Sequence, residues 1–255
     1  MKGLKKSRES LLQEQSNLEI KTLRFTDSNM DAKSAVLWLH ILCGAVAIVT
    51  MILAYITKKG PKMHAKVGRI YGYAMVGVGL TSIVLFLLGS STFLLLIAFF
   101  SLYLVLVGWR FAVNRKGAIT KVDNLLIKFG MIGGIALLIM AAFIASSGDA
   151  PFGLTKAFAA VPMTFGIISI ALAYQQNTLQ RDGSNPRGKQ RISMHITYMG
   201  AGTISTVTAF TITVLGSSIF TWLGATIIGT PLLVWNQVGV NRGKVAKSVV
   251  GSDSN

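Results

Sequence analysis

The residues best suited to chemistry in this chain are its three histidines, which stand at or near the ends of apolar segments. His40 lies about a turn and a half inside the first such segment, His64 leads into the second and His195 opens the sixth. Imidazole is a common axial ligand of haem iron and also titrates near neutral pH. The plain alternative for each is an interfacial side chain hydrogen bonded to headgroups or loop backbone.

Two axial ligands of one iron must face each other at one depth in the membrane. His64 and His195 both follow loops rich in Lys and Arg, so we expect them on the same side and predict that they bind the iron of haem b. The internal repeat described below aligns His195 with Gly68, one turn or about 6 Å deeper than His64. Helix tilt can absorb that difference, whereas His40 has no histidine partner at its depth.

A glycine follows two of the histidines four residues later, since Gly44 follows His40 and Gly68 follows His64. Positions i and i+4 share one face of a helix. A histidine beside a bare backbone patch leaves room for a flat ligand such as haem, or for a closely packed neighbouring helix.

The basic turn from Lys58 to Arg69 precedes the second apolar segment. Lys62, Lys66 and Arg69 could converge on an anion, either the propionates of haem or a phosphate headgroup. The alternative is anchoring to anionic lipid, worth about 1 kcal/mol per basic residue.

The sixth segment is rich in hydroxyl groups, which supports a different function. His195, Met199 and Thr206 fall on one helical stripe. With Thr203 and with His40 they could line a polar cavity of a small-molecule transporter or sensor. The same hydroxyls could instead join helices through hydrogen bonds of about 0.6 kcal/mol each.

The elements that position these residues are predicted to be membrane-spanning helices. Hydrophobic residues make up 52% of the 255 residues and charged residues only 13%, and the mean hydropathy is +0.58. This composition indicates a polytopic all-α membrane protein. Seven spans are predicted by hydropathy, at Ala35–Ile56, Val67–Leu88, Phe93–Val113, Leu125–Ala145, Ala157–Gln175, Met194–Leu215 and Phe220–Val238.

The domain limits and the orientation follow from the charges. Residues 1–33 form a polar tail, residues 34–240 the seven-helix domain and residues 241–255 a basic tail. With seven spans, 17 Lys and Arg of the loops and C-terminal tail fall on one side, and Lys156 alone on the other. The positive-inside rule therefore predicts a cytoplasmic C-terminus and an outer N-terminus in a bacterial plasma membrane. The seven Lys and Arg of the N-terminal tail oppose this orientation.

The sequence also repeats at an offset of 127 residues. The segment from Leu88 to Arg115 matches the segment from Leu215 to Arg242 at 12 of 28 positions, including Gly-Ser-Ser and Asn-Arg boundaries. We therefore predict two parallel three-helix repeats joined by the fourth helix, a 3+1+3 arrangement. Generic turn and anchor residues are the alternative explanation.

Several functions are disfavoured by what the chain lacks. No Asp or Glu falls within a predicted span, which argues against ion-coupled transport and against a magnesium or calcium cage. The single cysteine, Cys43, excludes an internal disulfide. The net charge of +16 lies beside the spans, so the expected partners are the bilayer, its anionic headgroups and a second copy of the chain, with no nucleic acid.

Three motifs together carry a resemblance. His40-x-x-x-Gly44, then Lys59-Gly60-x-x-x-His64-x-x-x-Gly68-Arg69-x-Tyr71, then Met194-His195 before a Thr-rich span, resemble a bacterial family of polytopic membrane proteins of unknown function. That resemblance implies a seven-span plasma-membrane protein without an assigned activity. The histidines are more distantly similar to the haem ligands of cytochrome b561-type proteins, which have more paired histidines. The 3+1+3 arrangement resembles the SWEET sugar exporters, but their Pro-Gln motif is absent.

Overall fold

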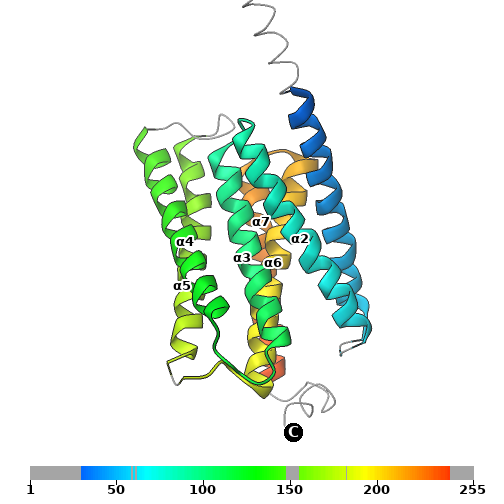
Figure 1. Cartoon of the computed structure of the whole chain (residues 1–255). Coiled ribbons are helices and arrows are strands. Elements are labelled where there is room, and N and C mark those ends of the chain that lie inside the picture. Colours follow the sequence, from blue (N-terminus) through cyan, green and yellow to red (C-terminus); the bar gives the residue numbers. More distant parts are fainter. Residues whose placement is uncertain (1–29, 59, 61, 148–154, 182, 242–255) are drawn as a thin grey trace, which may run out of the picture.

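The chain forms a bundle of long helices in the computed structural model, which describes residues 30–58, 60, 62–147, 155–181 and 183–241 (Figure 1). No strand occurs within these ranges. The predicted tails lie outside them, except for residues 30–33 and 241. The elements are a first helix at Met30–Ile56, then α2 (Met63–Leu87), α3 (Thr92–Val113), α4 (Lys121–Ser147), a 3-10 turn η2 (Lys156–Ala159), α5 (Ala160–Leu179), α6 (Gly188–Leu215) and α7 (Ile219–Asn241).

Seven of these segments are long and apolar enough to cross a membrane, which confirms the predicted all-α class with seven candidate spans. Helices satisfy their backbone groups within one segment, as hydrocarbon surroundings require. The helices extend beyond the predicted spans where the sequence becomes polar. Thus α4 begins at Lys121 and not Leu125, and α6 begins at Gly188 and not Met194, because hydropathy marks the apolar part of a helix and not its ends.

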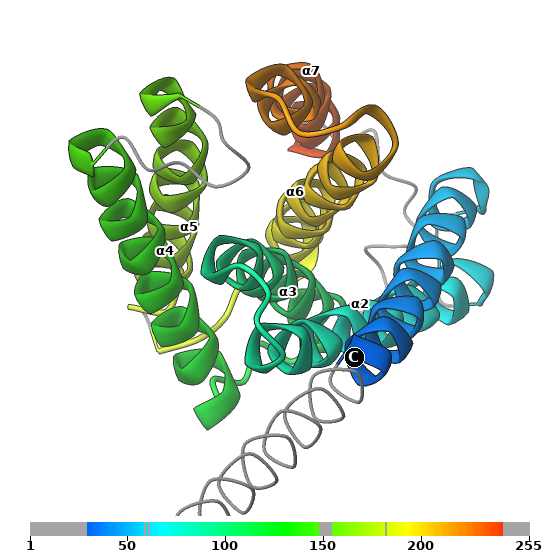
Figure 2. The same cartoon turned by 90° about the horizontal axis from the view of Figure 1, so that it is seen from above.

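The centre of the bundle is α3 (Figure 2). It packs against α2, α4 and α6, while α4 pairs closely with α5, and α6 with α7. Phe93, Tyr103, Leu104 and Val107 of α3 are at most 1% exposed and share an arc of about 100° around the helix. The first helix and α7 lie at the edge of the bundle and expose most of their apolar side chains.

The helix packing does not confirm the predicted 3+1+3 arrangement. α5 packs mainly on α4 and not on α6, so the last three spans do not form a compact group of their own. The turns at the predicted repeat boundary are nevertheless alike. Gly89 and Gly216, which are 127 positions apart, have φ angles of 85° and 83°, and Ser91 and Ser218 each accept a hydrogen bond from a backbone N–H of the helix that follows. The environments differ, since Phe93 is 1% exposed and Phe220 is 83% exposed.

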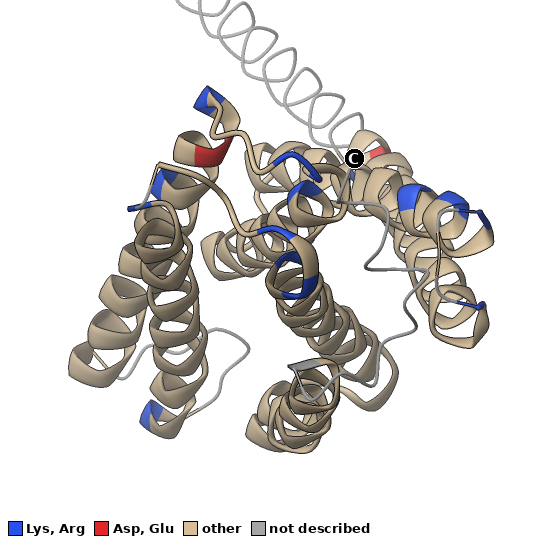
Figure 3. Cartoon of the chain, turned by 90° about the horizontal axis from the view of Figure 1, so that it is seen from below, with Lys and Arg blue, Asp and Glu red and all other residues tan. Residues whose placement is uncertain are grey.

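Lys and Arg residues gather at one end of the bundle, where α2, α4 and α6 begin and α3 and α5 end (Figure 3). Two arginines fix the end of α3 there. Arg110 donates from Nε and Nη2 to both carboxylate oxygens of Asp123, each at 2.8 Å. Arg191 of α6 donates to the carbonyls of Phe111 and Ala112 at 3.0 and 2.9 Å. The two bonds from Arg191 supply partners for carbonyls in the last turn of α3.

The crossing of α4 and α5 depends on two glycines in direct contact. A Cβ atom on Gly134 would lie 3.0 Å from the carbonyl oxygen of Gly166, and a Cβ on Gly166 would lie 2.9 Å from the carbonyl oxygen of Gly134. Small residues of this kind let helix backbones approach closely in membranes. The neighbouring Gly133 faces open space, with nothing within 4 Å of a Cβ atom.

We therefore expect Gly134→Val to lower the free energy of unfolding by about 1–3 kcal/mol, the usual cost of overpacking. Gly133→Val is the matched control, because it makes the same change of residue type one position away. Unfolding in mixed micelles with increasing denaturing detergent measures both. Equal loss of stability in the two variants would contradict the close crossing.

Candidate functional site

The imidazoles of His64 and His195 lie next to each other at the basic end of the bundle. Their ring centroids are 6.3 Å apart and the ring planes meet at 83°. His64 comes from the first turn of α2 and His195 from the second turn of α6. Both side chains are half-buried.

The end of the first helix orients His64. Its Nδ1 lies 3.0 Å from the carbonyl oxygen of Ala54. Ala54 is in the last turn of that helix. This contact therefore ties α2 to the end of the first helix.

The close approach of α3 and α6 orients His195. Its Nδ1 lies 2.9 Å from the carbonyl oxygen of Gly108 in α3. A Cβ atom on Gly108 would lie 2.8 Å from Cγ and 2.9 Å from the backbone nitrogen of Met199. Only glycine at position 108 allows α6 to lie this close, and the same bare surface gives the imidazole access to the carbonyl.

The two hydrogen bonds define the tautomer of both rings. A carbonyl oxygen can only accept, so Nδ1 of His64 and Nδ1 of His195 carry the proton and donate. In a neutral imidazole protonated on Nδ1, the lone pair is on Nε2. A proton on one ring nitrogen held by a backbone carbonyl is the usual arrangement of histidines that ligate metals through the other nitrogen.

Polar contacts continue from the histidines into the bundle between α6 and its neighbours. Thr206 donates to the Gly202 carbonyl at 2.9 Å, so the hydroxyl of Tyr71 donates to Thr206 Oγ1 at 3.0 Å. Nearer the basic end, the hydroxyl of Tyr55 lies 3.4 Å from Thr203 Oγ1. The α2 and α6 backbones do not pack closely, and the side chain of Tyr71 bridges the space between them. Tyr55 reaches α6 from the first helix.

The residues predicted to line a transport cavity fall into two separate places. Met199, Thr203 and Thr206 lie along α6 beside His195. His40 donates from Nδ1 to Thr81 Oγ1 at 2.8 Å, near the opposite end of α2. The fifteen positions between His40 and Tyr55, the partner of Thr203, correspond to roughly 22 Å of helix.

The three predicted anion-binding cations are all exposed. Relative to His64, Lys66 and Arg69 lie about 200° and 140° around the axis of α2 at ~100° per residue. Arg69 donates to the carbonyl of Ala65 at 3.2 Å, and Lys62 immediately precedes the helix. These cations therefore occupy the side of α2 opposite the histidine pair.

Sequence reasoning missed the groups that hold the histidines in place. Ala54 and Gly108 act through backbone carbonyls, and such acceptors leave no trace in side-chain chemistry. Tyr71 and Tyr55 could have been found from the sequence, because each is a polar aromatic residue near the end of an apolar span. Tyr71 also lies two helical turns after His64.

The geometry and the fold define a class of protein, an all-helical chain with seven candidate membrane spans and a paired-histidine site at its basic end. Comparison with family models, with curated proteins and with solved structures finds no match to this chain. The resemblance to a family of polytopic membrane proteins therefore stays a prediction from the quoted motifs.

We expect Tyr71→Phe to lower the free energy of unfolding by about 0.5–1.5 kcal/mol, because it removes a buried hydrogen bond between α2 and α6. Tyr73→Phe serves as the control, since Tyr73 is 66% exposed on the same helix. Detergent-induced unfolding followed by circular dichroism measures the difference. A Tyr73→Phe variant as unstable as Tyr71→Phe would show that the bond to Thr206 contributes nothing.

Proposed function

We propose that the protein binds haem b through His64 and His195 and acts in electron transfer at the membrane. The observation that carries this proposal is the paired imidazoles, 6.3 Å apart, with each Nδ1 held by a carbonyl of a different helix. When bound, the haem would supply one-electron redox chemistry.

The distance between the rings fits a single metal atom between them. A metal–imidazole bond is about 2 Å long, and the coordinating nitrogen lies about 1 Å from its ring centre. Two such ligands on opposite sides of one metal give roughly 6 Å between ring centres, by the same bond length. The 83° between the planes is compatible with ligation, because an axial imidazole can rotate about its metal–nitrogen bond.

The ligand count favours haem over a bare metal ion. Among the described residues no group of three or more His, Cys, Asp or Glu could hold a metal. A structural zinc ion needs four protein ligands. Porphyrin brings four nitrogens of its own, so two axial histidines complete its iron.

The chain's own residues would orient the ligands and exclude water. Ala54 and Gly108 hold the two rings in one tautomer, which spares the cost of orienting them when a ligand binds. Between α2 and α6 the side chains of Tyr71, Met75, Met199 and Val207 pack in one cluster, and Tyr71 is hydrogen bonded to Thr206.

The basic residues that precede and begin α2 have a different proposed role. Lys62, Lys66 and Arg69 were predicted to hold the propionates, but their position on α2 favours a role in anchoring this end of the helix to anionic headgroups.

A small-molecule transporter or sensor is the second candidate function. Its predicted cavity needs His40 and the hydroxyls of α6 in one place, whereas His40 is hydrogen bonded to Thr81. Tyr55, the partner of Thr203, lies about 22 Å from His40 along the first helix. The threonine hydroxyls are also hydrogen bonded, to backbone carbonyls or to tyrosine, and such bonds support helix association. The paired histidines therefore favour the redox proposal.

An absorption spectrum of the full chain tests the haem proposal. We expect a protein expressed with excess haem precursor to show a Soret band and the spectrum of six-coordinate low-spin iron. His64→Ala and His195→Ala should each lose that spectrum, because one axial ligand is removed. His40→Ala is the matched control and should keep it.

Absence of a Soret band in the folded wild-type protein would overturn the proposal. So would equal loss in all three variants, since His40 lies outside the pair. Circular dichroism of each variant distinguishes loss of the ligand from loss of the fold.

The orientation is a separate proposal, supported by the clustering of Lys and Arg at one end of the bundle (Figure 3). We propose that this end faces the cytoplasm of a bacterial plasma membrane, with the C-terminus inside and the N-terminus outside. The alike turns at Gly89 and Gly216 support the related proposal that the chain arose from a 3+1+3 repeat.

Fusion of a reporter to the C-terminus measures the orientation. A fluorescent protein that matures only in the cytoplasm should be bright there, and alkaline phosphatase, active only outside, should be inactive. The reverse result would place the basic end outside and contradict the positive-inside assignment.

A further inference from the structure

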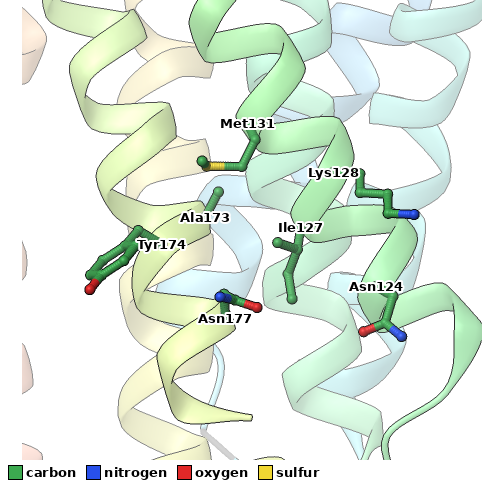
Figure 4. Close-up of a pocket in the computed structure, with 7 residues that line it drawn as sticks. All are labelled: Asn124, Ile127, Lys128, Met131, Ala173, Tyr174 and Asn177. Atoms are coloured by element: carbon green, nitrogen blue, oxygen red, sulfur yellow. The ribbon is translucent and has the colours of Figure 1, made fainter. Parts of the chain in front are cut away.

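A pocket of about 320 Å³ opens between α4 and α5, two helices that carry neither His64 nor His195 (Figure 4). Its polar wall is formed by Asn124 and Lys128 of α4 and by Tyr174 and Asn177 of α5. All four of these side chains are exposed, so a ligand can reach them without any movement of the helices.

The apolar wall of the pocket extends from the polar rim into the bundle (Figure 4). It is formed by Ile127 and Met131 of α4 and by Ala173 of α5, which are half-buried or buried. The helices are antiparallel, so Asn124 and Asn177 mark the rim nearest the basic end, and Met131 and Ala173 lie one to two turns further into the bundle.

The charge of the pocket selects an anion. Lys128 contributes a positive charge and the two asparagines contribute amide N–H donors, while none of the residues lining the pocket is acidic. The neighbouring carboxylate, Asp123, is 1% exposed and accepts hydrogen bonds from Arg110 and Thr120. It is therefore committed to the loop at the end of α3 and does not neutralise Lys128.

The depth of the pocket selects an amphipathic molecule. Lys128 follows the first residue of α4 by seven positions, or about 10 Å along the helix. At that level a lysine reaches towards the membrane surface while its stem covers apolar surface. A free phosphate would satisfy the rim but leave the half-buried Ile127 and Met131 uncovered, whereas a lipid covers both parts.

We propose that the pocket between α4 and α5 binds a phospholipid with an anionic headgroup. The phosphate binds at the rim formed by Lys128, Asn124 and Asn177, and an acyl chain lies against Ile127 and Met131. Basic pockets between membrane helices recognise lipids of this kind. The proposal is independent of haem, since no residue of the histidine pair takes part in it.

Lipid-dependent stability of the purified full chain tests this proposal. Phosphatidylglycerol should raise the midpoint of thermal unfolding more than phosphatidylcholine with the same acyl chains. Lys128→Gln should weaken the apparent affinity for phosphatidylglycerol at least about tenfold, the effect of losing a charged hydrogen bond. Lys128→Arg should retain most of it.

Lys121→Gln is the matched control, because Lys121 is exposed on the same helix but does not line the pocket. An equal effect of the two glutamine variants would show general attraction of anionic lipid to the basic end and would overturn the proposal. The same stabilisation by glycerol phosphate, which has the headgroup and no acyl chain, would also overturn it. If Lys128→Gln does not fold, Asn177→Asp provides the second test, since a carboxylate at the rim should repel the same headgroup.

Discussion

The distance between α3 and α6 and the direction of His195 depend on the contact between these helices at Gly108. There the backbone nitrogen of Met199 lies too close for any side chain at position 108, and the carbonyl of Gly108 accepts a hydrogen bond from His195. A single missing side chain thus sets the distance between two helices and the direction of one imidazole. Arg191 strengthens the same interface, because it donates to the last carbonyls of α3 at 2.9–3.0 Å.

The three histidines follow one structural rule. Each donates from Nδ1 to an acceptor on another helix, at Ala54, Thr81 and Gly108. In the apolar interior of a membrane a polar side chain needs a partner, and these partners join the first helix to α2 at both ends and α6 to α3. The histidines are therefore structural links as well as candidate ligands, and only the pair at the basic end brings two rings together.

The class of fold could be predicted from the sequence, because apolar runs of about twenty residues have few other solutions. Loop charges also correctly grouped His64 and His195 at one end. The side of α2 occupied by Lys66 and Arg69 could also be predicted, because the helical period alone places both residues away from His64. The bonds to Ala54 and Gly108 could not be predicted, since a backbone carbonyl exists at every position and only the packing selects one.

The internal repeat also shows that turns can be predicted from local sequence and that packing cannot. Identical residues at a 127-residue offset produce turns of the same conformation at Gly89 and Gly216, because turn geometry is a local property. Packing is not local. Phe93 enters the centre of the bundle and Phe220 faces outwards, so the same residue at equivalent positions has different neighbours.

The buried position of α3 has a consequence for the order of assembly. Chains are inserted from the N-terminus, so α3 enters the bilayer before the helices that later enclose it. Its mean hydropathy of 2.3 lets it reside among acyl chains during that interval. α6 has a mean hydropathy of only 1.3 and carries hydroxyl groups that need hydrogen-bond partners. It is inserted when α3 is already in the membrane. The more apolar helix is thus made first. The more polar helix is inserted afterwards, beside a helix that it packs against.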